Sequence, residues 1–203
     1  MNVVVVGNGA SALNKTNGDF INECDKVIRL GTFITEGYEK YIGSKTDIYV
    51  SRWFKSKIRS KDFFNTIKAL WIPRTYETRE KKYDELIKEY KIAELIKYIP
   101  NELIFCYKAR YPFRYIKKNI SRRGNEELYC CIPDSGIVAI DMARHLYPDH
   151  KIFISGFDNC ATGYYWNPDI VLDNPGDDLL HLQLVFLKSL LSSNVVTDLS
   201  NAL

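Results

Sequence analysis

The 203-residue chain has no run of eighteen apolar residues and no Cys-x-x-Cys pair among its five cysteines. The first absence predicts that no helix spans a membrane. The second, with the odd cysteine number, argues against a disulfide framework and a zinc site. Cys130 and Cys131 are neighbours in an expected strand, where they would face opposite ways as small core residues. This cysteine usage favours a reducing, cytoplasmic setting.

The chain also lacks internal repeats, low-complexity tracts and a recognisable linker. With 46% hydrophobic and 13% aromatic residues, it is expected to form one domain, residues 1–203, around a sizeable core. The first expected strand begins directly after Met1, which leaves no expected room for a signal peptide or an amino-terminal anchor.

What is present begins with the apolar run Val3–Val6, which breaks into Gly7-Asn8-Gly9. A buried strand that ends in glycines is typical of nucleotide-binding α/β sheets, because glycine lets the backbone approach a ligand. The dinucleotide fingerprint also needs an acidic residue at the end of the second strand. Residues 26–30, the expected second strand, offer Arg29 instead, which would suit the 2′-phosphate of NADP. An NADP-dependent oxidoreductase of Rossmann type is therefore one hypothesis. Such an enzyme needs a helical tyrosine with a lysine four residues later, whereas Tyr83 and Tyr90 of the expected helix 77–98 are followed at that spacing by Ile87 and Glu94.

Apolar segments alternate along the chain with amphipathic ones, and the connections are short. This pattern predicts an α/β fold, a single doubly wound, mostly parallel sheet with helices on both faces, Rossmann-like in type. The expected strands are near residues 2–6, 26–30, 46–50, 68–72, 102–107, 128–132 and 151–155, and the expected helices near 60–67, 77–98, 135–147 and 179–192.

A second group of motifs follows in the last third of the chain. An N-cap at Asp134 or Ser135 opens an apolar helix, and a strand then runs into Ser155-Gly156-Phe157-Asp158. With Gly7-Asn8-Gly9 and the Asp-x-Val-x-Arg pattern of residues 25–29, these motifs resemble the sialyltransferases. The resemblance is closest to the bacterial glycosyltransferase family 42 and more distant to the eukaryotic family 29. The remaining matching residues are Gly136, Tyr164, Tyr165 and His181.

The resemblance covers the first thirty-five residues and residues 128–190, whereas 52–127 match nothing. The chain departs from family 42 at Gly31, where that family has asparagine, and at Ile132, where it has arginine. Phe186 stands where the eukaryotic family has glutamate. The first two departures fall at the donor pocket and leave the identity of the donor sugar open.

The resemblance implies a single nucleotide-sugar-binding glycosyltransferase domain of the GT-A-variant sialyltransferase type. It implies inverting transfer of sialic acid or a related nonulosonic acid from a CMP-linked donor to a glycan or glycolipid acceptor. When such a donor reacts, the nucleotide leaves with a single phosphate. Neutral hydrogen-bond donors can stabilise the negative charge of one phosphate. The chain has no Asp-x-Asp motif, the pair that holds a divalent ion in many other transferases, so no metal and no cofactor are expected.

The resemblance and the chemistry together give the residues their expected roles. His181, near a helix start that favours neutral imidazole, would be the general base, while His145 and His150 are expected to be structural or solvated. Tyr164 and Tyr165 would stabilise the leaving phosphate, with Ser135 and Gly136 offering amides at a helix start. The expected donor-binding residues are Gly7, Asn8, Gly9, Ser11, Arg29, Gly31, Ser135, Gly136 and Asp158.

Charge is concentrated between residues 108 and 123, which hold seven basic residues and no acid, although the whole chain is only +3. Aromatic residues alternate with these charges. The segment is expected to face an anionic membrane or a phosphorylated glycolipid, which would make the enzyme peripheral on the membrane. A solvated loop and single-stranded nucleic acid are the alternatives. A non-catalytic nucleotide- or RNA-binding module is thus a further hypothesis, and the oligomeric state stays open.

Overall fold

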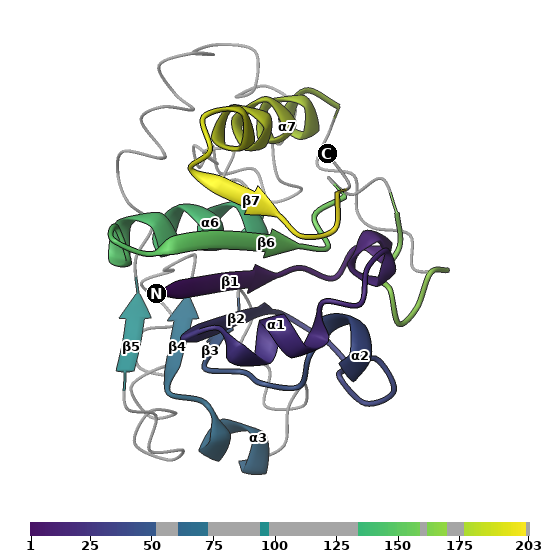
Figure 1. Cartoon of the computed structure of the whole chain (residues 1–203), viewed down its shortest axis with the longest axis vertical. Coiled ribbons are helices and arrows are strands. Elements are labelled where there is room, and N and C mark those ends of the chain that lie inside the picture. Colours follow the sequence, from purple (N-terminus) through teal and green to yellow (C-terminus); the bar gives the residue numbers. More distant parts are fainter. Residues whose placement is uncertain (52–60, 73–93, 98–133, 159–161, 170–176, 202–203) are drawn as a thin grey trace, which may run out of the picture.

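The computed structural model describes residues 1–51, 61–72, 94–97, 134–158, 162–169 and 177–201. These residues form one sheet of seven strands in the order β5-β4-β3-β2-β1-β6-β7, and every neighbouring pair is parallel (Figure 1). The strands are β1 (Asn2–Val6), β2 (Lys26–Leu30), β3 (Ile48–Val50), β4 (Ala69–Ile72), β5 (Glu94–Lys97), β6 (Lys151–Ser155) and β7 (Val196–Asp198).

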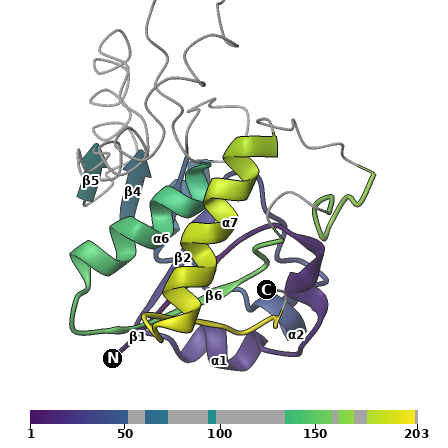
Figure 2. The same ribbon diagram turned by 90° about the horizontal axis from the view of Figure 1, so that it is seen from above.

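Helices cover both faces of the sheet, which confirms the predicted α/β fold. Helices α6 and α7 lie on one side of the strands, and α1 and α2 lie on the other (Figure 2). The helices are α1 (Gly18–Glu23), α2 (Glu39–Ile42), α3 (Lys61–Thr66), α6 (Ser135–Leu146) and α7 (Asp177–Ser192), with a 3₁₀ helix at Ala10–Leu13. Within the described part of the chain, none of them is long and apolar enough to cross a membrane.

The valine run of β1 is buried on both faces of the sheet. Side chains alternate along a strand, so Val3 and Val5 pack into the core under α6 and α7. Val4 and Val6 pack into the opposite core, with Ile21 of α1. Because both faces are covered, the strand is continuously apolar rather than alternating.

Two strands differ from the sequence prediction. Glu94–Lys97 form strand β5 at the edge of the sheet, so the predicted helix 77–98 is wrong over those four residues. The opposite edge strand β7 was not predicted, since its three residues include a single buried one, Val196. A strand this short carries no readable period and depends on its neighbour for pairing. The predicted strands 102–107 and 128–132 lie outside the described residues, as does most of the predicted helix.

The strand order places β1 between β2 and β6. The chain winds outward from β1 in both directions, and loops from such a reversal point diverge at the carboxyl ends of the central strands, where α/β sheets bind ligands. Helix α6 runs antiparallel to the strands, so its first turn lies at this same edge. The candidate site is therefore expected at the loops after β1, β2 and β6.

One cysteine of the five lies in the described core. Cys24 is buried beside α1, and burial raises the pKa of its thiol to about 11. The thiol therefore stays protonated at neutral pH and behaves as a small apolar side chain. Cys106, Cys130, Cys131 and Cys160 lie outside the described residues.

Candidate active site

The loops after β1 and β6 continue the pairing of their strands. The amide of Gly7 donates to the carbonyl of Ser155 at 2.7 Å, and the amide of Gly9 donates to the carbonyl of Gly156 at 3.0 Å. The two loops thus leave the sheet together rather than diverging at once.

Glycine is required in these loops by their mutual contact. A Cβ on Gly7 would lie 2.4 Å from the carbonyl oxygen of Gly156, and a Cβ on Gly9 would lie 2.4 Å from a carboxylate oxygen of Asp158. Gly156 itself has a φ of +73°, which side-chain-bearing residues rarely adopt. The first two glycines were predicted to let a ligand approach the backbone, but the second loop fills the space beside them.

Asp158 cross-links the two loops. Its carboxylate accepts hydrogen bonds from the amide of Ser11 at 3.0 Å, from the Ser11 hydroxyl, and from the Thr162 hydroxyl at 2.5 Å. Thr162 in turn accepts a hydrogen bond from the amide of Ala10 at 3.1 Å. Asp158 therefore shapes the turn that carries the predicted donor-binding residues, and its own oxygens are engaged within the protein.

Asn8 joins three loops. Its side-chain amide donates to the carbonyls of Leu30 at 3.0 Å and Thr32 at 3.1 Å, and its backbone carbonyl accepts from the amide of Tyr165 at 2.8 Å. Its Oδ1 atom is buried and has no hydrogen-bond partner among the residues that the structure describes. A hydrogen-bond acceptor in this position is suited to an N–H or O–H group of a bound ligand.

The two neighbouring tyrosines have different surroundings. Tyr165 is 5% exposed, and its hydroxyl donates to the carbonyl of Ile34 at 2.7 Å while accepting from the Ile34 amide at 3.2 Å. Its ring packs edge-on against Tyr38. Tyr164 forms backbone bridges to Gly9 and its ring lies against Trp166. Tyr165 is thus engaged in holding the loop after β2, while Tyr164 lies beside Gly9 in the loop after β1.

Arg29 is not in the site. It points from β2 toward α2 and is fully buried, and its guanidinium donates to the carbonyls of Ile42 at 2.6 Å, Gly43 at 3.0 Å and Lys45 at 2.9 Å. These carbonyls end α2, where a cation is favoured. Its expected donor-binding role is therefore wrong, as is the expected contact with a 2′-phosphate. Alternation along β2 decides this, because Ile28 and Leu30 face the other side.

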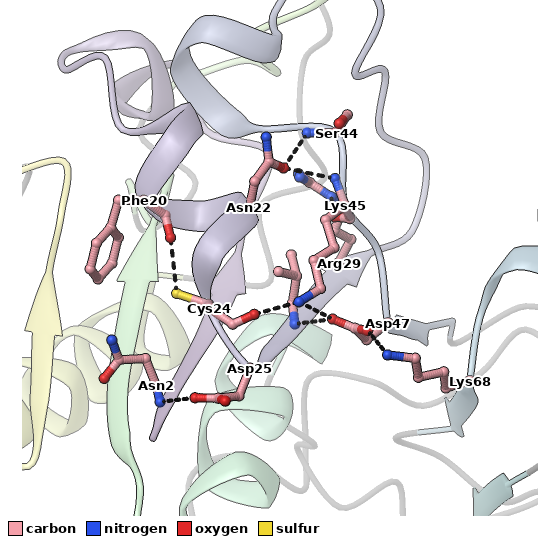
Figure 3. Close-up of polar contacts among 11 residues, drawn as sticks. Asn2, Phe20, Asn22, Cys24, Asp25, Arg29, Ser44, Lys45, Asp47 and Lys68 are labelled. Carbon is pink, nitrogen blue, oxygen red and sulfur yellow. Dashed lines mark hydrogen bonds and ion pairs between the residues drawn. The ribbon is translucent and has the colours of Figure 1, made fainter.

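A polar cluster completes the surroundings of Arg29 at the amino end of β3. Asp47, which is 2% exposed, accepts the amide of Val27 at 2.9 Å and the ammonium of Lys68 at 2.6 Å. Lys45 lies 3.4 Å from the same carboxylate (Figure 3). These contacts join β2, β3 and β4 and explain why charged residues are buried there.

Gly31 lies at the carboxyl end of β2 with a φ of +52°. No atom lies within 4 Å of the position a Cβ would take, so the backbone conformation and not crowding favours glycine. Asparagine is among the residues that tolerate this conformation best. Glycine in place of the asparagine of family 42 therefore suits this backbone conformation and leaves no side chain at the carboxyl end of β2.

Ser135 and Gly136 lie at the first turn of α6, at the same edge. A Cβ on Gly136 would lie 2.7 Å from the ring of Phe157 and 3.2 Å from Leu30. The helix start therefore sits over the ends of β6 and β2. The predicted N-cap Asp134 makes no capping hydrogen bond through its side chain. Instead, its amide donates to the side chain of Gln183 at 2.6 Å.

Gln183 also locates His181. It lies in α7 and is 1% exposed, and its contact with Asp134 sets this part of α7 beside the start of α6. His181 is two residues nearer the start of α7, and one residue advances a helix by about 1.5 Å. The backbone of His181 therefore lies at the edge that carries the other candidates, while its side chain lies outside the described residues.

Sequence reasoning missed several residues that build this site. Gln183 was recognisable as the one amide in the apolar sequence of α7, and Thr162 as a hydroxyl four residues after Asp158. Phe157 belongs to the motif Ser155-Gly156-Phe157-Asp158, but no role was predicted for its side chain. Within the described part of the chain, no group of three or more histidine, cysteine or acidic residues could hold a metal ion.

Comparison with known proteins identifies the family. The model of glycosyltransferase family 29 (sialyltransferase) matches residues 2–167. The chain belongs to this family. The match runs through residues 52–127, which the motifs alone do not cover, and family 29 is the more distant of the two resemblances that the motifs suggested.

Curated relatives are sialyltransferases. The human CMP-N-acetylneuraminate-beta-1,4-galactoside alpha-2,3-sialyltransferase is 25% identical over 98% of this chain and 57% of its own length. The mouse lactosylceramide alpha-2,3-sialyltransferase is 23% identical over 98% of this chain and 53% of its own length. The chain thus spans little more than half the length of these relatives.

A solved mammalian sialyltransferase in complex with Gal-beta-1-3GalNAc-ortho-nitrophenol has a similar fold. It superposes with a TM-score of 0.59 at 17% identity, over 98% of this chain and 69% of its own. The likeness agrees with the parallel sheet and its covering helices, so the family 29 chain also has a sialyltransferase fold.

Proposed function

We propose that this chain is an inverting sialyltransferase that uses a CMP-linked donor. The donor carries sialic acid or a related nonulosonic acid, and the acceptor is a glycan or glycolipid. Membership of family 29 carries the proposal. The convergence of Asn8, Tyr164 and the start of α6 at one edge of the sheet supports it.

In this proposal the donor nucleotide lies over the ends of β1 and β2. The buried Oδ1 of Asn8 accepts a hydrogen bond from the nucleotide. The amides at Ser135 and Gly136 face the single phosphate, which the positive end of α6 attracts. Tyr164 adds a hydroxyl to the leaving phosphate. These neutral groups make transfer independent of a metal ion.

The reaction forms a bond between the acceptor oxygen and the anomeric carbon of the sugar, and breaks the bond from that carbon to the phosphate oxygen. The acceptor hydroxyl attacks from the face opposite the leaving CMP, which inverts the configuration. His181 takes the proton of the hydroxyl as the bond forms. CMP leaves with the electron pair of the broken bond.

The names of the relatives indicate which class of acceptor to expect. As their names state, the human relative acts on a beta-1,4-galactoside and the mouse relative on lactosylceramide. A chimpanzee relative, 26% identical, is a type 2 lactosamine alpha-2,3-sialyltransferase. We therefore propose an acceptor that ends in galactose, on a soluble glycan or on a glycolipid.

Calorimetry with a panel of nucleotides tests the donor. CMP and CTP are expected to bind more tightly than NAD, NADP or UDP, with EDTA present throughout. The reason is that no carboxylate stands at the end of β2 to hold a dinucleotide ribose, and that the proposed mechanism uses no metal. Tight binding of NADP without a response to cytidine nucleotides would contradict the proposal, and so would CMP binding that needs magnesium.

The proposal includes peripheral attachment of a cytoplasmic enzyme to an anionic membrane. The basic segment 108–123 lies outside the described residues, so the argument rests on its charge. Each basic residue near an anionic surface contributes about 1 kcal/mol, an attraction that salt screens. The chain is expected to sediment with anionic liposomes but not with neutral ones, and to be released by high salt.

A variant with glutamine at four positions of the segment is expected to stay in the supernatant while CMP binding is unchanged. The positions are Lys117, Lys118, Arg122 and Arg123. Salt-dependent binding of single-stranded RNA by a parent that ignores anionic liposomes would replace the membrane with nucleic acid as the partner of this segment.

A further inference from the structure

Three adjacent strands bring hydroxyl and carboxylate groups together at the carboxyl edge of the sheet. Ser11 follows β1, Asp158 follows β6, and Ser200 follows β7. The strands lie side by side and parallel in the order β1-β6-β7, so their following loops meet although Ser11 and Ser200 are 189 residues apart. The group lies beside the turn that begins at Gly9.

The segment after β7 is bound to the segment that carries this turn. The side-chain amide of Asn17 donates to the carbonyl of Leu199 at 3.0 Å, and that of Asn14 donates to the carbonyl of Ser200 at 3.4 Å. The amide of Leu199 also continues the pairing with β6 by donating to Ile154 at 2.8 Å. The end of β7 is thus held against both β6 and residues 14–17.

Two serine hydroxyls lie side by side between two carboxylates inside this contact. Ser11 donates to Asp158, while Ser200 donates to Asp198 through its hydroxyl at 2.6 Å and its amide at 2.9 Å. The two hydroxyl oxygens lie 3.4 Å apart. Ser11 is 8% exposed and Ser200 is 2% exposed, so neither hydroxyl can exchange its partner for bulk water without opening the structure.

We propose that Ser200 is a positioning residue for the donor-binding turn, acting through Ser11. The inference rests on the proposed function, because it takes residues 8–11 to face the donor. With Ser200 fixed by Asp198, the hydroxyl of Ser11 is confined to the side of Asp158. That contact holds the amide of Ser11, and with it Gly9 and Asn8, in the conformation that binds the nucleotide. The strand β7 and its following residues then govern donor affinity without touching the donor.

The test compares Ser200→Ala with the control Ser193→Ala. Ser193 also hydrogen-bonds locally, to the carbonyl of Ser189 at 2.7 Å, but it lies before β7 and away from the turn. Ser200→Ala is expected to weaken CMP binding about three- to tenfold, with turnover at saturating donor little changed. This range is the worth of one buried hydrogen bond, here the bond from Ser11 to Asp158 that the substitution loosens. Amide exchange of residues 9–13 in the unliganded protein should become faster in this variant alone. Asp198→Ala, which releases the same hydroxyl, should behave alike.

A double-mutant cycle shows whether the effect passes through Ser11. In a Ser11→Ala background, the change Ser200→Ala is expected to weaken CMP binding no further. Additive losses, or a parent and a Ser200→Ala protein with equal CMP affinity and equal exchange at residues 9–13, would overturn the positioning role alone. A parent that binds no CMP would overturn the proposed function and this role with it.

Discussion

Replacing His181 with alanine is expected to lower turnover by roughly two to four orders of magnitude. The variant would lack the group that takes the proton of the acceptor hydroxyl, so the attacking oxygen would reach the transition state without a base. The donor contacts assigned to Asn8, Tyr164 and the start of α6 would stay in place. CMP affinity measured by calorimetry should therefore equal that of the parent.

His145→Ala is the matched control for His181. His145 lies in the last turn of α6, roughly 15 Å along the helix from its start at the site edge. Its ring approaches the carboxylate of Asp141 within the same helix. Turnover of this control should match the parent. Parent-like turnover of His181→Ala would remove the histidine from the mechanism, while lost CMP affinity would make it a donor-binding residue.

Arg29→Met is expected to lower the free energy of unfolding by roughly 3 to 5 kcal/mol. Methionine fills much of the buried volume but donates nothing to the carbonyls of Ile42, Gly43 and Lys45. Each buried acceptor that loses its partner costs about 1–3 kcal/mol, and structural relaxation recovers part of the sum. Urea denaturation followed by circular dichroism measures the loss.

Lys68→Met is the control for this change. Its side chain is 64% exposed and pairs with the buried Asp47 at 2.6 Å. Lys45 stays 3.4 Å from the same carboxylate when Lys68 is replaced, so the loss should be smaller than for Arg29→Met. If Arg29→Met unfolds like the parent but binds CMP or NADP more weakly, Arg29 contacts the donor after all and the structural role assigned here is incorrect. CMP affinity of the folded variant is expected to be unchanged.

The central elements follow from local sequence alone. The valine run of β1 is apolar at every position, which a strand covered on both faces requires, and the glycines after it mark where the strand ends. The helix from Ser135 and the strand from Lys151 carry equally clear signals, and the structure has both. Edge strands β5 and β7 have weak signals of their own, because pairing with a neighbour stabilises them more than their composition does.

The motifs also predicted that the candidate residues meet at one edge of the sheet, but not the contacts that each of them makes. Sequence order alone indicates that Gly7-Asn8-Gly9, Ser135-Gly136 and the loop from Asp158 follow strands or start helices at one edge of a parallel sheet. The structure brings these groups together as expected.

Only the tertiary structure decided which of these residues are engaged within the protein. Arg29 and Tyr165 are polar and near the motifs, and in sequence they are indistinguishable from ligand-binding residues. The direction of a side chain depends on strand alternation and on what lies opposite it, which for Arg29 is the end of α2 and for Tyr165 the backbone of Ile34. Ser200 gave no local signal, since its contact with Ser11 exists only because β7 pairs beside β6. The sequence by itself determined the parallel sheet and the edge that carries the site, because periodicity and glycine are local properties. The partners of each buried polar group were decided by packing between distant segments.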